Sequence, residues 1–367
     1  MRPYDYLIVG SGLFGAVFAQ QMKQVGKRCL VIDKRPHVGG NVYCDNLDGI
    51  QVHKYGPHIF HTNDADIWAF VNRFVSFNEY KHAPWANYQG KMIPLPFNLN
   101  TFRALWGPLS EAEAKEKLAE QVKPYAKKRP KNLEEQALST VGRDVYETLI
   151  KGYTEKQWGK SAAELPAFII KRLPVSFSTE NRYFKDRYQG IPVGGYNKII
   201  DGLLAGVEVK LSVDFFQDRE FWTSRASKVV FTGPIDAYFN HQFGPLEYRG
   251  LEFLNTRLEI PQFQAHAQVN YTDANTPYTR IIEHKHFEFG QQNHTVITHE
   301  YSKTWSVGEE PFYPINDDVN QAVYRKYEAL AKTQENVLFG GRLGEYRYYD
   351  MHQVIGSALQ KAKAEIS

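Results

Sequence analysis

Short apolar runs bounded by turn-forming residues mark the beginning of the chain. Residues 7–9 form one run, which stops at Gly10, and residues 29–32 form another, which ends at Asp33. Continuous runs of this length are typical of parallel strands covered on both faces. The stretch between them, residues 16–25, has the pattern of a helix. The N-terminal region is therefore predicted to be a strand–helix–strand unit.

A helical and charged pattern occupies residues 99–152. Within it, Ser110 is followed three residues later by Glu113, which is a capping-box start. Asn132 followed by Glu135 is a similar cap signal. We interpret this region as a helical insertion rather than as part of the N-terminal sheet.

The remaining patterned stretches suggest that the chain leaves the N-terminal domain and returns to it. Residues 64–77 have apolar positions at helical spacing, whereas residues 250–312 alternate as antiparallel strands do. Residues 228–234 and 336–342 each read as a strand that ends in glycine, and residues 354–366 as a terminal helix. We expect the strand at 228–234 to return to the N-terminal domain, and the segment 336–342 repeats the strand–glycine pattern of that domain.

Glycines at the end of the first strand give the chain its first chemical signal. Gly10, Gly12 and Gly15 form G-x-G-x-x-G, and Asp33 ends the second strand, which together are the dinucleotide-binding fingerprint. In this motif the glycines allow a tight turn, close approach to a pyrophosphate and close helix packing, and the acid accepts hydrogen bonds from a ribose. An incidental glycine-rich turn is the alternative. The predicted cofactor contacts here are Gly10, Ser11, Gly12, Phe14, Gly15 and Asp33.

A second glycine pair, Gly39 and Gly40, favours FAD as the dinucleotide. A paired glycine shortly after the ribose acid typifies flavin enzymes, although a plain turn is the alternative. Residues 192–195 enter a helix as in amine-oxidase-like flavoproteins, and the strand expected to meet the adenine spans residues 207–215. No second fingerprint indicates a separate NAD domain. The further predicted cofactor contacts are Lys34, Gly40, Asn41, Val213, Asp214 and Phe215.

Three histidines, His53, His58 and His61, lie close together in the sequence. They match no closed zinc spacing, and no cysteine or carboxylate partner is patterned nearby, so we predict no metal site. A loop between strands, with its backbone against a flavin ring, fits the neighbouring glycine and proline better.

Residues 152–160 are predicted to be a loop rich in stacking and hydrogen-bonding side chains, which suits a flat base. The alternative is that Tyr153 and Trp158 anchor the core between helices. Residues 166–174 are a proline-bounded apolar stretch that carries Arg172, and we expect a mobile flap near residues 160–176. Lys171 and Arg172 could equally be a solvated pair.

Composition narrows the class of protein. The 367 residues are 43% hydrophobic, which allows two or three domains, and the net charge of +3 is too small to indicate nucleic-acid binding. Neither of the two cysteines has a metal-ligand spacing. Residues 7–19 resemble a signal-peptide core but lack a preceding basic cluster, and no run is long enough for membrane insertion. We expect a soluble, cytoplasmic protein.

The predicted fold class is α/β: a discontinuous Rossmann-like FAD-binding domain of the glutathione-reductase/amine-oxidase type, with a helical-bundle insertion and an antiparallel β-sheet domain. The FAD-binding domain is assigned to residues 1–80, 190–240 and 317–367. The helical domain is assigned to 98–170. The sheet domain, which would meet the substrate, is assigned to 81–97, 177–189 and 241–316.

A series of motifs resembles the bacterial UDP-galactopyranose mutases over essentially the whole chain. In order they are VGSGLFGAV, KRPHVGGN, HKYGPHIFHT, KGYTEKQWG, IIKRLPV, RYQGIPVGGY, PYTRIIEHKHF and FGGRLGEYRYYDMHQVI. The resemblance implies a homodimeric isomerase that converts UDP-galactopyranose to UDP-galactofuranose for cell-surface polysaccharide. It also implies FAD that is active when reduced, with NAD(P)H or another donor as external reductant.

The resemblance also implies roles for individual residues. Arg172 and Arg280 would meet the diphosphate and, with His61, form the catalytic set. Further cofactor contacts would be His58, Ile59, Gly341, Arg342, Asp350 and Met351. Further substrate contacts would be Tyr153, Thr154, Trp158, Tyr183, Asn270, Tyr313 and Tyr348.

In the implied chemistry, N5 of reduced flavin attacks the anomeric carbon, UDP leaves, and the sugar recloses as the furanose. The rivals are an ordinary flavin oxidase or dehydrogenase, which the cofactor motifs alone would favour, and a non-catalytic flavin- or nucleotide-sugar-binding protein.

Overall fold

The structure is a computed structural model that describes residues 2–126, 129–170 and 175–366. The chain divides into two compact units. The first comprises Met1–Tyr80, Asp186–Arg249 and Trp305–Ser367, and the second Lys81–Lys185 and Gly250–Thr304. The helical segment and the antiparallel strands, assigned to separate domains from the sequence, thus lie in one unit.

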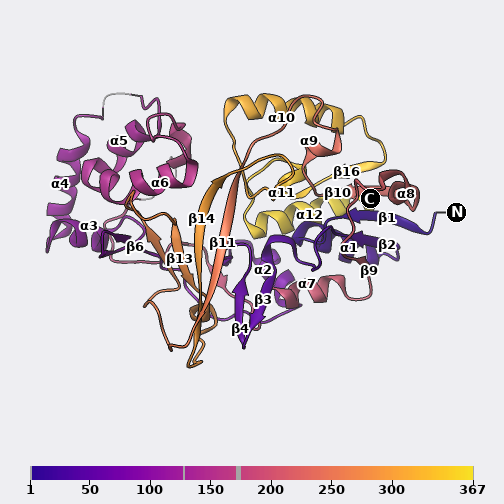
Figure 1. The fold of residues 1–367 in the computed structure, drawn as a ribbon, viewed down its shortest axis with the longest axis horizontal. Coiled ribbons are helices and arrows are strands. Elements are labelled where there is room, and N and C mark those ends of the chain that lie inside the picture. Colours follow the sequence, from indigo (N-terminus) through magenta and orange to yellow (C-terminus); the bar gives the residue numbers. More distant parts are fainter. Residues whose placement is uncertain (1, 127–128, 171–174, 367) are drawn as a thin grey trace. The chain divides into compact units, whose positions relative to one another are not determined.

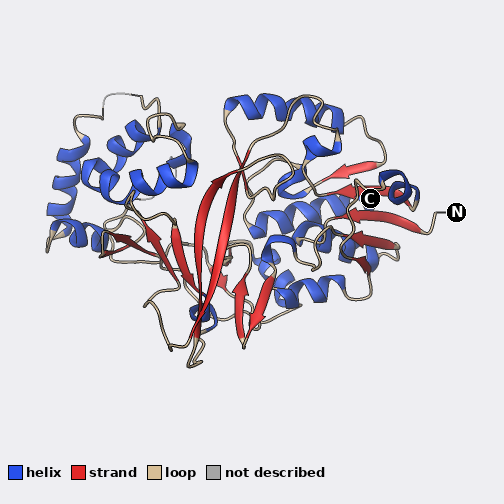
Figure 2. Ribbon diagram, viewed as in Figure 1, coloured by secondary structure: helices blue, strands red, loops and turns tan. Residues whose placement is uncertain are grey.

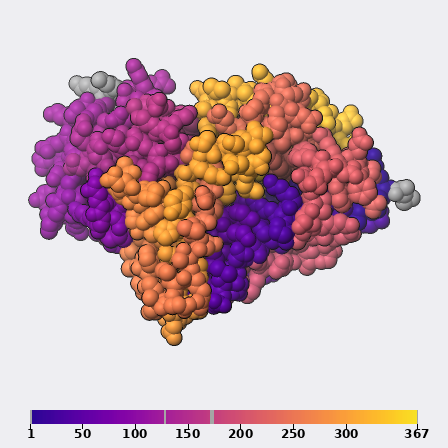
Figure 3. All heavy atoms as spheres, viewed as in Figure 1, coloured from indigo at the N-terminus to yellow at the C-terminus, as the bar shows by residue number. Residues whose placement is uncertain are grey.

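A five-stranded parallel sheet forms the centre of the first unit (Figure 1). Its order is β16 (Val337–Phe339), β10 (Ala226–Phe231), β1 (Tyr4–Val9), β2 (Cys29–Ile32) and β9 (Glu208–Lys210). The register pairs Val9 with both Ile32 and Phe231, so these strands end together at one edge. Three segments far apart in the sequence therefore build one sheet, and Figure 3 shows indigo, salmon and yellow segments packed together in this unit.

Helices cover the faces of this sheet, and the unit also contains two small two-stranded antiparallel sheets (Figure 2). The helix after β1 is α1 (Leu13–Gln24), whose Phe14, Val17 and Phe18 are buried. The others are α2 (Ala65–Asn72), α7 (Asn197–Leu204), α8 (Arg219–Ser224), α9 (Ile235–Tyr238), α10 (Asp318–Ala331), α11 (Gly341–Gly344), α12 (Met351–Ile366) and the 3-10 turn η1 (Gly40–Val42). One of the small sheets is the hairpin of β3 (Cys44–Leu47) and β4 (Ile50–His53), and the other pairs β5 (Phe60–Thr62) with β8 (Tyr188–Gly190), which is distant in the sequence.

The strands predicted at residues 7–9, 29–32 and 228–234 and the terminal helix are confirmed, with small shifts of boundary. The strand predicted over residues 207–215 is wrong beyond Lys210, because Ser212 has φ +56° and turns the backbone out of the ladder. The N–H groups of Ser212 and Val213 donate instead to the carbonyls of Arg35 and Asp33.

In the second unit a sheet runs in the order β11 (Tyr248–Leu258), β14 (Thr295–Thr304), β13 (Arg280–Glu283), β12 (Gln268–Tyr271), β6 (Trp85–Tyr88) and β7 (Lys91–Pro94). The β12–β13, β13–β14 and β6–β7 pairs are antiparallel, whereas β12 and β6 run parallel. The first residues of β11 belong to the first unit, where Tyr248 pairs with Pro314 of β15 (Tyr313–Pro314). Residues 284–288, predicted as strand, form the 3-10 turn η4 (His284–Glu288).

The helices of the second unit enclose a core that includes Phe102, Leu133 and Tyr146. They are α3 (Leu99–Trp106), α4 (Glu111–Val122), α5 (Leu133–Val145), the π-helix η2 (Tyr146–Ile150), α6 (Lys151–Trp158) and the 3-10 turn η3 (Ala167–Ile170). The capping box of Ser110 and the cap of Asn132 are both confirmed. Among the described residues, no helix combines the length and apolarity needed to cross a membrane.

A buried histidine in the second unit predicts a pH dependence of stability. His284 bonds through Nε2 to Thr298 Oγ1 at 2.6 Å, and Thr298 donates to Asn255 Oδ1. Burial lowers the pKa of His284 to about 3, and the neighbouring Glu283 opposes this only in part. Since histidine in an unfolded chain has a pKa of about 6.5, the unfolded state takes up the proton first as pH falls.

The free energy of unfolding is therefore expected to fall as pH drops below 6.5, with His284 contributing about 2 kcal/mol between pH 7 and pH 5. Urea unfolding of the wild type and His284→Gln at both pH values measures this contribution by difference, because other titrating groups are common to both. The prediction would be contradicted if the free energy of unfolding fell by the same amount between pH 7 and pH 5 in both proteins.

Candidate functional site

Two glycine loops touch at the carboxyl edge of the parallel sheet. Gly10 has φ +107°, which gives the turn after β1, and a Cβ on Gly15 would lie 2.0 Å from the Gly10 carbonyl oxygen. A Cβ on Gly40 would lie 3.0 Å from the Cα of Gly12, and Gly39 N–H donates to Ser11 O at 3.0 Å. The N-terminus of α1 thus opens on a surface of bare backbone, as a pyrophosphate site requires.

The predicted ribose acid, Asp33, is itself a structural member of this cradle. Its Oδ2 accepts from Ser11 N at 2.8 Å and from Ser11 Oγ at 2.6 Å, and its Oδ1 accepts from Arg35 N at 2.9 Å. A carboxylate offers about four lone-pair directions, so one remains on Oδ1 for a hydroxyl. Asp33 therefore fixes the Ser11 loop and can still accept one further hydrogen bond.

A third glycine segment, Gly340–Gly341, lies on the ring of Phe14, where a Cβ on Gly340 would come within 2.1 Å of it. Arg342 follows and donates to Phe312 O at 2.5 Å. Its Nε is buried without a hydrogen-bond partner among the described residues. An unpaired buried donor beside the cradle fits an anionic or polar ligand, because leaving it unsatisfied is costly.

Of the remaining predicted cofactor contacts, Lys34 and Asn41 lie on either side of Arg35, which the sequence argument missed. Arg35 donates to Asn41 Oδ1 at 2.9 Å, pairs with Glu310 and lies 4.2 Å from the ring centroid of Tyr55. Lys34 Nζ is 3.6 Å from Glu310. The only signal for Arg35 in the sequence is its position in a basic pair, Lys34-Arg35, directly after the predicted ribose acid Asp33.

The residues predicted to lie near the adenine, Val213, Asp214 and Phe215, are held by backbone and side-chain contacts within the first unit. Val213 N–H donates to Asp33 O at 2.9 Å, and Asp214 Oδ1 accepts from Phe216 N at 2.9 Å. Phe215 is buried in the core, where its ring faces that of Tyr238 at 6.4 Å. The side chain of Phe215 is therefore part of the core, and the predicted cofactor contact can involve only its backbone.

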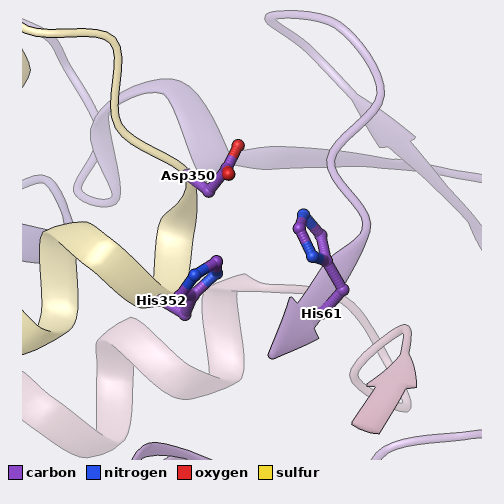
Figure 4. A group of neighbouring side chains, drawn as sticks. All are labelled: His61, Asp350 and His352. Atoms are coloured by element: carbon purple, nitrogen blue, oxygen red, sulfur yellow. The ribbon is translucent and has the colours of Figure 1, made fainter. Parts of the chain in front are cut away.

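One of the three predicted histidines, His61, lies close to two residues that are distant from it in the sequence. His61 on β5, Asp350 and His352 offer ligand atoms that all lie within 4.8 Å of one another, and Figure 4 shows the three side chains around a common space. Burial lowers the pKa of His352, which favours its neutral ring. Two imidazoles and a carboxylate can also hold a metal ion. No carboxylate lies near these histidines in the sequence, but the structure supplies one, Asp350, from the residue that precedes α12.

His58 and Ile59 precede β5 and belong to the loop that leads to it. His58 bonds through Nδ1 to Gly56 O at 2.8 Å, and its own N–H donates to His53 Nδ1 at 3.0 Å. Ile59 is buried. The sequence argument also missed Asp186, whose Oδ2 lies 2.7 Å from His61 Nδ1.

Tyr313 and Tyr348, predicted to meet the substrate, are brought together in the first unit. Their rings stack with centroids 6.0 Å apart, and the Arg342 guanidinium lies 5.7 Å from the Tyr348 centroid. Tyr348 is 58% exposed. A stacked aromatic pair with one exposed ring beside an arginine is suited to polar, ring-shaped ligands.

The prediction of a loop at residues 152–160 is wrong. These residues form most of the helix α6, which is followed by Gly159 with φ +67°. Lys156 fixes this helix by donating to the carbonyls of Tyr271, Thr276 and Tyr278. Thr154 is buried, Tyr153 is half-buried, and Trp158 packs against the helical core. The anchoring alternative therefore holds for Trp158.

Arg280 and Asn270 are cross-strand neighbours on β13 and β12. Arg280 Nη2 lies 2.7 Å from Oε1 of Glu300, whose side chain is only 2% exposed, and Asn270 Oδ1 accepts from Gln268 Nε2. Tyr183, also in the second unit, is fixed by its N–H to His82 O at 2.8 Å and keeps an exposed ring. Arg172 lies outside the described residues, as do the other residues of the predicted flap between 171 and 174.

Sequence comparisons match two families. The UDP-galactopyranose mutase family matches residues 148–348, and the NAD(P)-binding Rossmann-like domain matches residues 8–74. Among curated proteins, a probable UDP-galactopyranose mutase of Klebsiella pneumoniae is 36% identical and covers 100% of this chain and 96% of its own. A dTDP-fucopyranose mutase of Escherichia coli is 37% identical, with 98% of both chains covered. The UDP-galactopyranose mutase of Mycoplasma genitalium is 30% identical, over 100% of this chain and 96% of its own.

Solved structures show the same fold. A reduced UDP-galactopyranose mutase superposes with a TM-score of 0.78 at 14% identity, covering 100% of this chain and 94% of its own. A variant of putrescine oxidase superposes with a TM-score of 0.59 at 12% identity, covering 99% of both chains. The architecture is therefore that of flavin enzymes of the amine-oxidase type, as predicted.

Proposed function

This chain belongs to the UDP-galactopyranose mutase family, and on that premise we propose that it is an FAD-dependent isomerase of nucleotide sugars, with UDP-galactopyranose and UDP-galactofuranose as its substrate pair. The observation that carries the proposal is the match of the whole chain to the Klebsiella pneumoniae relative, which covers both units. A dinucleotide site alone would fit many oxidoreductases.

The residues at the carboxyl edge of the sheet fit FAD as the cofactor. The Gly12–Gly40 contact presents backbone to a pyrophosphate, Asp33 retains one acceptor direction for a ribose hydroxyl, and Arg342 Nε is buried without a partner among the described residues. When bound and reduced, a flavin supplies the nucleophile that a reaction at an anomeric carbon without net oxidation needs.

The chain's own contribution would be to hold the nucleotide and to neutralise the leaving diphosphate. We assign the charge to Arg280, oriented by buried Glu300, and to Arg172. A guanidinium is suited to this task because its planar donors match phosphate oxygens. Tyr313 and Tyr348 would bind the sugar nucleotide, as would Tyr153, Thr154, Trp158, Tyr183 and Asn270. His61 would act beside the flavin.

A second candidate substrate pair is that of dTDP-fucose, because the relative named for dTDP-fucopyranose is as similar to this chain as the relative named for UDP-galactopyranose. Both substrates are nucleoside diphosphate sugars, so the diphosphate contacts would be shared. They differ at sugar C6, which is hydroxylated in galactose and a methyl group in fucose, and in the base and ribose.

Purified protein, reduced with dithionite, is expected to convert UDP-galactofuranose to UDP-galactopyranose, and the oxidised protein is not. Parallel assays with dTDP-fucofuranose give the ratio of the two kcat/KM values, which decides between the substrates. Oxygen-dependent turnover with peroxide would instead indicate an oxidase. Binding of UDP without isomerisation in either redox state would indicate a non-catalytic binding protein.

The resemblance further supports a homodimer and reduction by NAD(P)H or another external donor. Light scattering coupled to gel filtration measures the first. Anaerobic bleaching of the flavin absorbance by NADH or NADPH measures the second.

A further inference from the structure

A hydrogen-bond chain beside β5 has a direction that the backbone fixes. Arg187 N–H donates to Asn63 Oδ1 at 2.9 Å. Because a backbone N–H is only a donor, this oxygen is the acceptor end of the amide, and Asn63 Nδ2 points the other way. Asn63 Nδ2 donates to Asp186 Oδ1, and the other carboxylate oxygen, Oδ2, lies 2.7 Å from His61 Nδ1.

Strand pairing brings these groups together. β5 and β8 are antiparallel, with His61 opposite Gln189 and Thr62 opposite Tyr188, so Asn63 lies beside Arg187 and Asp186 follows one step on. The side chains of His61 and Asp186 are 11% and 21% exposed. The contact is therefore built into the sheet and is largely shielded from water.

We propose that Asp186 is a positioning residue that sets the tautomer of His61. A carboxylate oxygen accepts only, so in the neutral form of the ring the proton resides on Nδ1, and the lone pair is on Nε2, the nitrogen that does not face Asp186 (Figure 4). The His352 ring meets the His61 ring edge-on at 5.3 Å, which limits rotation of the imidazole. Asp186 and His352 thus fix the orientation of the His61 ring, and Asp186 selects the nitrogen that carries the proton.

The inference rests on the proposed function in one respect only, which is that the group facing His61 is a flavin. A purely structural Asp186, which ties the ends of β5 and β8 together, would stabilise the fold without controlling the ring. The two roles differ in what they predict for Asp186→Asn.

In Asp186→Asn the direction of the chain dictates how the new amide is oriented. Asn63 still donates, so it takes the amide oxygen, and the amide NH2 then faces His61 Nδ1. Nδ1 must become the acceptor, and the proton moves to Nε2. The substitution therefore inverts the tautomer while preserving size and contacts.

The test combines tautomer and kinetics in the FAD-loaded protein. Long-range proton–nitrogen NMR of histidine-labelled protein, with the His61 signals assigned through His61→Gln, is expected to show protonated Nδ1 in the wild type and protonated Nε2 in Asp186→Asn. We expect kcat of the reduced enzyme to fall about 10- to 100-fold, as when partners of functional histidines are lost, with KM little changed.

Two further variants make the result specific. Glu365→Gln removes a carboxylate of similar burial on α12, which pairs with Lys228 of β10. It should change neither the tautomer of His61 nor kcat. Adding Asn63→Ala to Asp186→Asn frees the new amide to rotate and is expected to restore protonated Nδ1 and part of kcat.

A wild-type tautomer and wild-type kcat in Asp186→Asn would overturn the proposal, as would loss of thermal stability without a change of tautomer. The tautomer does not depend on turnover. If it inverts in a protein that isomerises neither sugar nucleotide, the proposed function fails and this inference stands. If the enzyme isomerises its substrate and the tautomer is unmoved, only this inference fails.

Discussion

Replacing Arg280 by alanine is expected to lower kcat of the reduced enzyme by about 30- to 1,000-fold, equivalent to ~2–4 kcal/mol of transition-state stabilisation. The guanidinium lies 2.7 Å from the buried carboxylate of Glu300, and its own side chain is only 14% exposed. A cation fixed in such a poorly hydrated place interacts strongly with the charge that develops on a leaving diphosphate. Steady-state kinetics with the preferred sugar nucleotide, under dithionite, provide the measurement.

The same substitution leaves the buried carboxylate of Glu300 without its arginine, so a loss of stability has to be distinguished from a loss of catalysis. Breaking a buried ion pair by removing one partner destabilises a protein because a charge is left uncompensated. Arg280→Ala combined with Glu300→Gln removes that charge and should recover the thermal midpoint without recovering kcat. Arg257→Ala, which removes an exposed arginine from β11 in the same unit, is the matched control and should alter neither. Near-normal turnover by Arg280→Ala would show that the assigned diphosphate role is wrong.

Local signals predicted the parts of the structure that depend on neighbours in the sequence. The turn at Gly10, the packing of Gly15 and the cap of Ser110 each follow from residues a few positions apart. The prediction that residues 228–234 return to the first domain also holds, since β10 pairs with β1 there. These features need no knowledge of the rest of the fold.

Features that depend on distant partners could not be predicted in this way. Residues 152–160 have two glycines and many polar groups, and what holds them in a helix is Lys156 bonding to carbonyls more than 100 residues away. The cluster of His61 with Asp350 and His352 forms only when α12 packs beside β5. Asp186 reaches His61 through strand pairing. In each case the sequence shows the residue type but not its partner.

Gly12→Ala is expected to weaken FAD binding about 10- to 100-fold while leaving the apoprotein folded. Gly12 has φ −69° and ψ −177°, which any residue adopts, and a Cβ there would meet only the Cα of Gly40 at an ordinary 3.8 Å. The protein itself therefore has room for the methyl group. The pyrophosphate would not, because the backbone N–H groups need close approach to form charge-assisted hydrogen bonds worth about 1.5–3 kcal/mol each. Flavin fluorescence titration of the apoprotein measures the affinity.

Gly15→Ala provides the contrast that makes this result interpretable. Its Cβ would lie 2.0 Å from the Gly10 carbonyl oxygen, so the backbone must move, and we expect a loss of about 1–3 kcal/mol in the free energy of unfolding as well as loss of FAD. Gly356→Ala, within α12, is the control that should retain both. Of these substitutions, only Gly12→Ala is expected to weaken FAD binding without lowering the stability of the protein. A Gly12→Ala protein that binds FAD as tightly as the wild type would mean that no pyrophosphate approaches this turn, and the cradle of Gly12 and Gly40 would have to be assigned to another role.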